Sequence, residues 1–264
     1  MSVLDNELFV KVQNAVFDYP VFPTLWIPHC IMMSLALRNT LGGNWRGFSR
    51  QHPMSCFILA TLYTFPGGIL ATAMLAQPVL SFMLNTPFVL AMMGSWYLVF
   101  YSPNDLFFQL VTKTGLILPF SGAQDFLRLH LVLSGVQTIH QLHPGSFFYP
   151  VVFAICKSSG FMFLKYAEYI LANGLNQAFV IPHHSTKTCI LASVILTLQS
   201  LGHLPIDLKP LFAILVGISL SFRLLTVLSS WDPYQAFENV FCAIAFGRPI
   251  ENASPSKKKN KKED

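Results

Sequence analysis

The sequence predicts an all-α membrane protein with seven transmembrane helices. Hydrophobic residues make up 53% of the 264 residues and charged residues only 11%, whereas a soluble domain carries about 25% charged residues. Seven apolar segments approach the ~20 residues that a membrane span needs. The mean hydropathy of +0.52 and the 24 Phe residues exclude a disordered chain. A water-soluble enzyme is excluded as well, because too few charges remain to cover a globule of this size.

The first three predicted spans differ in length and in what interrupts them. The span at about Val21–Leu37 is short and contains two prolines. The span at Met54–Ala76 is the clearest by length and has Gly67-Gly68 near its middle. The third span, about Phe88–Ser102, is closed by the turn-forming run Pro103-Asn104-Asp105.

The last four predicted spans are apolar overall, and three of them carry ionised side chains. In chain order they cover about Leu116–Ile139, Phe147–Leu164, Thr188–Leu204 and Pro210–Ser230. The first of these four carries one Asp and one Arg, the second one Lys and the last one Arg. Such charges are costly in a bilayer and therefore informative.

Basic residues predict the orientation, because cytosolic connections carry an excess of Lys and Arg. Three Arg follow the first span, Lys residues follow the third and fifth spans, and the tail contains one Arg and five Lys. Basic residues thus fall mainly on alternate connections, on the same side as the tail. We therefore expect residues 1–20 to be lumenal, residues 21–231 to form the transmembrane domain, and residues 232–264 to be a cytosolic segment with a Lys-rich tail.

Two spans contain small residues in mid-helix and are expected to bend there. The second has Pro66, Gly67 and Gly68, and the fifth has Ser158, Ser159 and Gly160. Because the second and fifth spans are three positions apart in chain order, the second run is inverted relative to the first, as in the repeats of many transport proteins. Carbonyl groups freed by a kink must face protein, water or an ion. The alternative role of these small residues is close helix packing.

Ionised groups within the spans are the other candidate functional residues. Lys157, Lys187 and Arg223 are interpreted as pathway charges, with snorkelling toward the membrane surface as the alternative. Each such charge costs roughly 2.5–3.5 kcal/mol at a helix centre on insertion scales. Asp125 and Arg128 are three residues apart and can pair on one helix face, either as a local structural ion pair or as part of a functional site.

Enzyme and metal signatures are missing from the sequence. It contains no nucleophile elbow, zinc-protease motif, Walker loop or dinucleotide-binding glycine motif, and its eight His do not fall at metal-ligand spacing. The excess positive charge is largely a property of the tail and does not indicate nucleic-acid binding. We expect neither catalysis nor a bound metal or cofactor.

The C-terminus ends in a pattern that resembles an intracellular address. Lys261 and Lys262 occupy the fourth and third positions from the end. This is the dilysine form of an endoplasmic-reticulum retrieval signal, which coat machinery reads on the cytosolic side. The alternative is a solvated basic tail that binds anionic lipid.

Several short stretches, in this order and spacing, resemble the trimeric intracellular cation channel (TRIC) family of the endoplasmic and sarcoplasmic reticulum. They are Phe22-Pro23, Gln51-His52-Pro53, Phe65-Pro66-Gly67-Gly68-Ile69-Leu70, Leu75-Ala76-Gln77-Pro78, Trp96-Tyr97, Tyr101-Ser102-Pro103-Asn104-Asp105-Leu106, Leu196-Thr197-Leu198-Gln199 and the lysine-rich end Lys257–Asp264. The similarity covers nearly the whole chain. It implies two inverted three-helix repeats plus a final helix, assembled as a homotrimer in which each subunit holds its own pore.

The resemblance also implies a function and a lipid site. The family conducts monovalent cations, mainly potassium ions, as the counter-current to calcium release, through a pore lined by the two kinked helices. A phosphoinositide lipid is held at the subunit interface by a Lys-Glu-Val-x-Arg stretch in the fourth span. Here the stretch reads Gln124-Asp125-Phe126-Leu127-Arg128, which assigns the lipid to Gln124 and Arg128 but replaces a charged Lys with a neutral Gln.

Two other functions remain open at this point. A small-solute carrier would use a binding site at the same kinks and would show saturable flux in place of unitary currents. A non-conducting membrane scaffold is the other alternative, since the lipid-binding Lys and some of the glycines that the family carries are replaced here.

Overall fold

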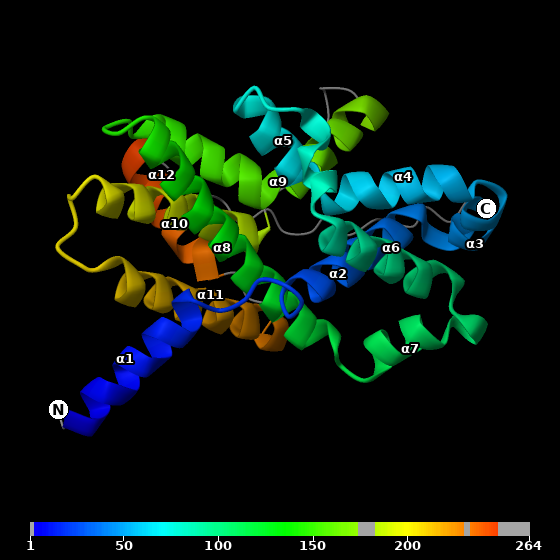
Figure 1. The fold of residues 1–264 in the computed structure, drawn as a ribbon, viewed down its shortest axis with the longest axis horizontal. Coiled ribbons are helices and arrows are strands. Elements are labelled where there is room, and N and C mark those ends of the chain that lie inside the picture. Colours follow the sequence, from blue (N-terminus) through cyan, green and yellow to red (C-terminus); the bar gives the residue numbers. More distant parts are fainter. Residues whose placement is uncertain (1–2, 174–182, 230–232, 248–264) are drawn as a thin grey trace, which may run out of the picture.

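The computed structural model describes residues 3–173, 183–229 and 233–247, and all regular secondary structure in these ranges is helical (Figure 1). The α-helices are α1 (Val3–Phe17), α2 (Trp26–Leu41), α3 (Trp45–Gln51), α4 (Pro53–Thr64), α5 (Pro66–Met74), α6 (Thr86–Tyr101), α7 (Leu106–Lys113), α8 (Ile117–Leu142), α9 (Phe148–Asn173), α10 (His184–Ser200), α11 (Leu208–Ser229) and α12 (Pro233–Phe246). Short 3-10 helices lie at Gly42–Asn44, Val79–Leu84 and Pro103–Asp105.

Each of the seven predicted spans overlaps a helix or, for the second span, the pair α4 and α5. By length and composition alone, α11 is the one helix of the described residues that could cross a membrane, and up to three spans result if two bent pairs each count as one. The bent pairs are α4 with α5, at 63°, and Pro103–Lys113 with α8, at 74°. The seven-span architecture with inverted repeats therefore stays a prediction.

The helices form two groups with separate apolar cores. One core joins α2, α4 and α6 around Tyr63 and Val99, and the other joins α8, α9, α10 and α11 around Phe212 and Leu196. A smaller cluster containing Trp26, Phe65 and Leu127 lies between the two groups. The two groups are visible as the right-hand and left-hand parts of Figure 1.

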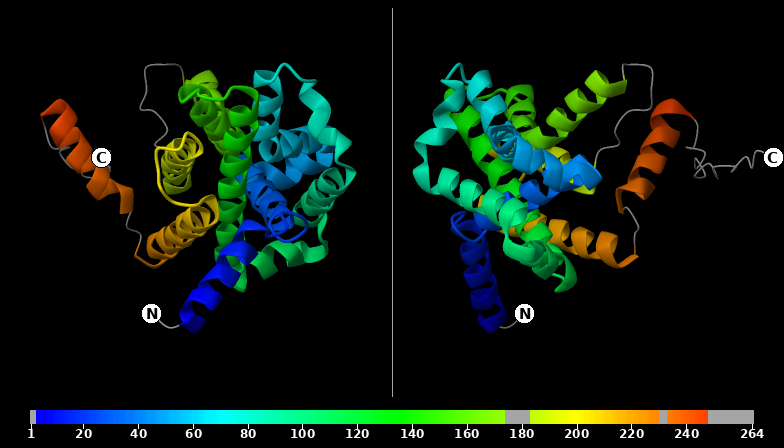
Figure 2. Two further views of the ribbon diagram at one scale, coloured as in Figure 1. Left: turned by 60° about the vertical axis from the view of Figure 1, so that its left-hand side comes forward. Right: turned by 90° about the vertical axis from the view of Figure 1, so that its right-hand side faces the viewer.

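Four helices were not foreseen among the spans: α1, α3, α7 and α12. Helix α1 projects away from the other helices, and its C-terminal end packs on α11, where Phe17 meets the ring of Phe212 edge-on (Figure 2). Helices α3 and α7 lie in the connections after the first and third predicted spans. The Lys-rich tail, including Lys261 and Lys262, lies outside the described residues.

Candidate functional site

The predicted break in the second span is present between α4 and α5. Helix α4 ends at Thr64, and Phe65 has non-helical torsions of φ −109° and ψ 15°. Pro66 begins α5 and has no backbone N–H to continue the hydrogen-bond ladder of α4. The chain therefore bends by 63° and leaves carbonyl groups at the end of α4 without helical partners.

The predicted interruption in the fifth span is milder. Helix α9 runs through it, but Ser159 departs from helical torsions, with φ −119° and ψ 21°. The side chain of Ser159 is fully buried, and its hydroxyl has no hydrogen-bond partner among the described residues. The small residues thus bend α9 without opening it completely.

The two interruptions touch each other directly, backbone against backbone. A Cβ atom at Gly67 would overlap the carbonyl oxygen of Lys157 and lie 2.9 Å from its carbonyl carbon. A Cβ atom at Gly160 would lie 2.6 Å from the carbonyl carbon of Pro66. By contrast, a Cβ atom at Gly68 would meet only Phe82 Cβ, at an ordinary 3.8 Å. Close helix packing, the alternative raised from the sequence, therefore explains Gly67 and Gly160.

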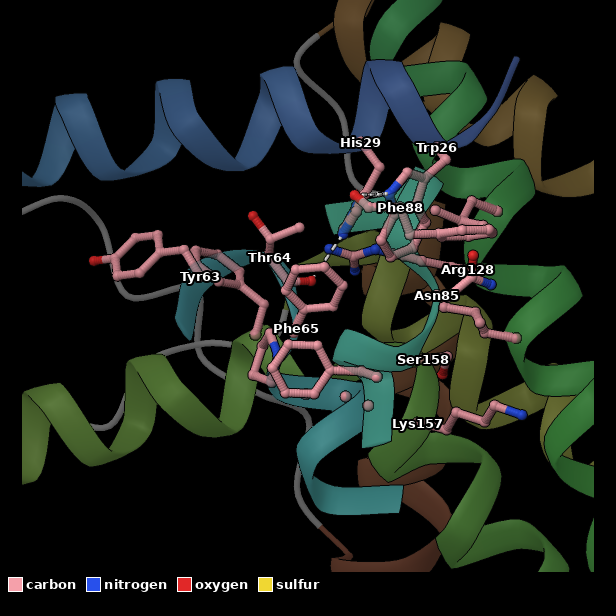
Figure 3. Close-up of a pocket in the computed structure, with 18 residues that line it drawn as sticks. Trp26, His29, Tyr63, Thr64, Phe65, Asn85, Phe88, Arg128, Lys157 and Ser158 are labelled. Atoms are coloured by element: carbon pink, nitrogen blue, oxygen red, sulfur yellow. Dashed lines mark hydrogen bonds between the residues drawn. The ribbon is translucent and has the colours of Figure 1, made fainter. Parts of the chain in front are cut away.

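A cavity of about 220 Å³ lies beside this crossing (Figure 3). Seven of the predicted site residues line it: Pro66, Gly67, Gly68, Arg128, Lys157, Ser158 and Gly160. Aromatic rings, among them Trp26, Phe65 and Phe88, form much of its wall. Ser159, the other predicted kink residue, does not line it.

Two successive hydrogen bonds connect the wall of this cavity to the break between α4 and α5. His29 Nε2 lies 3.2 Å from the carbonyl oxygen of Thr64, which can only accept, so Nε2 carries the proton. The side-chain amide of Gln124 then donates to His29 Nδ1 at 3.5 Å. Helix α8 is thereby linked through α2 to a carbonyl group that the bend has freed. Gln124 is 5% exposed, and its amide nitrogen takes part in this pair of hydrogen bonds.

A second cavity, of about 350 Å³, lies among α2, α8, α9, α10 and α11. Gln124, Arg128, Lys165 and Arg223 contribute its polar lining. Arg128 and Phe161 line both cavities, so these two side chains lie where the cavities approach each other. No carboxylate of the described residues lines either cavity.

Arg128 and Lys157 are two charged side chains at these cavities that no described carboxylate contacts directly. Neither forms a hydrogen bond or an ion pair with a described residue. Lys157 lies at the opposite side of the first cavity from His29 (Figure 3), with its ammonium group 6.0 Å from the centre of the Phe153 ring. An unpaired charge in this setting requires water or an anion nearby.

The local ion pair between Asp125 and Arg128 is not formed, so that interpretation was wrong. Asp125 instead accepts from Nε and Nη2 of Arg223, at 2.6 and 2.8 Å. Nη2 of Arg223 also donates to the Ser185 hydroxyl at 2.9 Å, and His184 Nε2 lies 3.9 Å from Asp125. Residues three apart are neighbours on a helix surface, but both carboxylate oxygens of Asp125 accept from Arg223, and no hydrogen bond or ion pair joins Asp125 to Arg128 among the described residues.

The remaining predicted charges have structural surroundings. Arg223 lines the second cavity, but its guanidinium group is held by Asp125. Lys187 lies outside both cavities and forms a 2.8 Å ion pair with Glu238 of α12. His29 and Phe161 were missed from the sequence. A lone His in an apolar span was the one available signal for His29, and nothing distinguished Phe161 from the other 23 Phe residues.

Comparisons with known proteins agree on one family. The family model described as TRIC channel matches residues 43–230. The Caenorhabditis elegans protein named trimeric intracellular cation channel type 1B.2 is 30% identical over 256 residues, which cover 94% of this chain and 81% of that protein. The Homo sapiens protein named trimeric intracellular cation channel type A is 27% identical over 233 residues, covering 86% of this chain and 77% of that protein.

A solved structure gives the same result for the fold. A trimeric intracellular cation channel from C. elegans, determined in the absence of Ca²⁺, matches with a TM-score of 0.79 and 27% identity. The match covers 86% of this chain and all of the chain in that structure.

Proposed function

The chain belongs to the TRIC channel family, and from this premise we propose that it is a homotrimeric potassium channel of the endoplasmic or sarcoplasmic reticulum. It supplies counter-ion current while calcium leaves the store. Its N-terminus is lumenal and its C-terminus is cytosolic. Lys261 and Lys262 are then available to coat machinery that returns the protein to the reticulum.

The observation that supports conduction best is the pair of cavities that share Arg128 and Phe161. One cavity adjoins the break between α4 and α5, and the other opens among α8, α10 and α11. A route within a single subunit passes from one to the other at these two side chains. Phe161 is its apolar constriction, and Arg128 is the charge that an ion meets there.

The charges along this route set its properties. Arg128 and Lys157 repel cations, and no described carboxylate lines the cavities to offset them. Potassium flux is therefore limited, and displacement of either group by the membrane potential changes the barrier. Each elementary charge that crosses 100 mV contributes ~2.3 kcal/mol.

The lipid site fits this chain through Arg128 and less well through Gln124. Arg128 has no partner among the described residues, so its guanidinium group is available to a lipid phosphate. Gln124 is buried and donates to His29. We therefore assign a phosphoinositide headgroup at the subunit interface to Arg128, with no direct contact from Gln124.

The test is a recording from purified protein in planar bilayers with potassium on both sides. A channel gives unitary currents. A carrier gives slow, saturable flux with counter-transport, and a scaffold gives neither, so either outcome contradicts the proposal.

Two matched variants locate the route. Phe161→Ala should enlarge the unitary current, because it widens the constriction. Phe163→Ala, two residues along α9 and outside both cavities, should leave the current unchanged. Equal currents in the two variants would place the route elsewhere.

A further inference from the structure

A third cavity lies away from the two already described, between α3 and the turn that joins α6 to α7. Its volume is about 400 Å³, and its lining is mostly polar. Arg46 and Arg50 line it from α3, and Ser102, Asn104 and Asp105 line it from the turn. Trp45, Phe100 and Tyr101 complete the wall.

The wall of this cavity is fixed by a partly buried ion pair. Arg38 donates to both carboxylate oxygens of Asp105, at 2.6 and 2.5 Å, and to the carbonyl oxygen of Val99 at 2.9 Å. Its guanidinium carbon lies 3.6 Å from the ring centre of Trp45 and 3.7 Å from that of Phe108. Arg38 therefore cannot swing into the cavity, and its charge is matched by Asp105.

The turn itself is held in an unusual conformation. Asn104 and Asp105 both have positive φ angles, 49° and 62°. Two successive residues of this kind are costly unless contacts hold them, although Asn and Asp tolerate the conformation best. Tyr101 donates to the carbonyl oxygen of Ser49 at 2.7 Å, which ties the turn to α3. The cavity is thus preformed.

Two further Arg side chains line the cavity, and its one carboxylate, Asp105, is already paired with Arg38. Arg46 is 63% exposed on its side chain and lies 3.7 Å from Asp105, whose oxygens already accept from Arg38. Arg50, one turn further along α3 on the same face, forms no hydrogen bond or ion pair with any described residue. The Ser102 hydroxyl accepts from the backbone N–H of Phe107, which leaves its own proton to donate. The Asn104 side chain adds a further donor.

From this arrangement we infer that the third cavity binds a phosphate monoester, held by Arg46 and Arg50 and oriented by Ser102 and Asn104. Planar guanidinium groups match phosphate oxygens in pairs, and hydroxyl and amide donors complete the coordination. Carboxylate ligands fit less well, because a cavity rich in donors offers more hydrogen bonds than two oxygens can accept. The site differs from the lipid contact proposed at Arg128, which lines the other two cavities.

Two sources could supply this phosphate. The connections that form the cavity contain three Arg and are expected on the cytosolic side, where anionic lipids gather at the membrane surface. A lipid headgroup and a soluble phosphate ester present the same chemistry to Arg46 and Arg50. The experiment separates them.

The experiment uses full-length protein that carries Arg128→Gln, so that lipid at the interface site does not contribute. Calorimetry in an uncharged detergent measures binding of glycerol phosphate. Native mass spectrometry measures phosphatidic acid retained after extraction from phosphatidylcholine vesicles doped with that lipid. Arg46→Gln with Arg50→Gln should weaken binding by about tenfold or more, as expected for the loss of charge-assisted hydrogen bonds.

The matched control is Lys113→Gln, which removes an exposed charge from the same side without lining the cavity. It should leave binding unchanged. Binding of glycerol phosphate identifies a soluble source, and retention of phosphatidic acid alone identifies a lipid. No binding of either probe, or equal losses in the control, would overturn the inference.

A second measurement does not depend on the folding of a variant. In the Arg128→Gln protein, phenylglyoxal modifies exposed arginines, and the bound phosphate should protect Arg46 and Arg50. Unprotected modification of both residues at saturating probe would also overturn the inference. Neither readout requires ion conduction, so failure of the channel proposal and failure of this site are distinguishable.

Discussion

Asp125 and Arg128 lie within one turn of each other on α8, yet they occupy opposite situations. Asp125 is 2% exposed and is held by Arg223 through two hydrogen bonds. Arg128 lines two cavities and has no charged partner among the described residues. A buried charge with its partner fixes how helices pack, whereas a charge beside a cavity acts on whatever enters that cavity. We therefore expect these two neighbouring charges to differ in role, with Asp125 acting on stability and Arg128 acting on whatever enters the cavities.

Breaking the ion pair between Asp125 and Arg223 should have the largest effect on stability. Arg223→Ala leaves the Asp125 carboxylate buried without its main partner, which should destabilise the protein by about 3–5 kcal/mol. Thermal unfolding in detergent measures the loss. Replacing both Asp125 and Arg223 with Leu should recover most of it, because removing both members of a buried pair is often neutral. An Arg223→Ala protein as stable as the wild type would contradict a structural role for the pair.

The crossing of the two interrupted helices provides the next test. Gly67→Ala places a methyl group against the backbone of Lys157, which cannot move as a side chain can. We expect a loss of about 1–3 kcal/mol, as for other overpacked sites. Gly68→Ala is the matched control, since its methyl group meets Phe82 at an ordinary distance. If the two variants unfold at the same temperature, α5 and α9 do not touch at Gly67.

Replacing Arg128, which lines the cavities, should change the potassium current and leave the stability of the protein nearly unchanged. Arg128→Gln should change the free energy of unfolding by no more than about 0.5 kcal/mol. It should raise the unitary potassium current, because a repulsive charge leaves the constriction. Lys209→Gln, which removes a charge at the contact between α1 and α11, should leave the current unaffected. Reduced stability with an unchanged current would mean that Arg128, like Asp125, has a structural role.

The smallest expected effect is a pH dependence at the third cavity. The hydrogen bonds from Arg38 lower the pKa of Asp105 below its usual 3.8. A carboxyl group with a lowered pKa in the folded state stabilises the protein above the pKa of the unfolded chain and loses this contribution as the pH falls through the folded value. Wild-type stability should therefore decline below about pH 4. Asp105→Asn should lack this part of the decline in acid unfolding curves.

The sequence indicated the helices better than the site. Each predicted span overlaps a helix, and the break at Pro66 was expected, because apolar length and a missing backbone donor act locally. Helix α7 was missed, since it is short and lies in a connection. The partner of Asp125 was assigned to the nearest opposite charge on the same helix, whereas the actual partner is 98 residues away.

The sequence also left two roles open for the small residues. A run such as Pro66-Gly67-Gly68 is compatible with a kink that faces water and with close packing against another helix. The structure distinguishes them residue by residue: Gly67 packs against α9, and Gly68 has room. Nothing in the sequence separates two neighbouring glycines of this kind.

The sequence by itself determined that this is a helical membrane protein, where its apolar helices lie and where one of them breaks. These properties depend on residues close together in the chain, through hydrophobic length, proline and glycine. Tertiary structure decided which charges are paired, which glycines touch and where the cavities form. Those outcomes depend on side chains that meet from distant helices, and their energies arise only once the helices have packed.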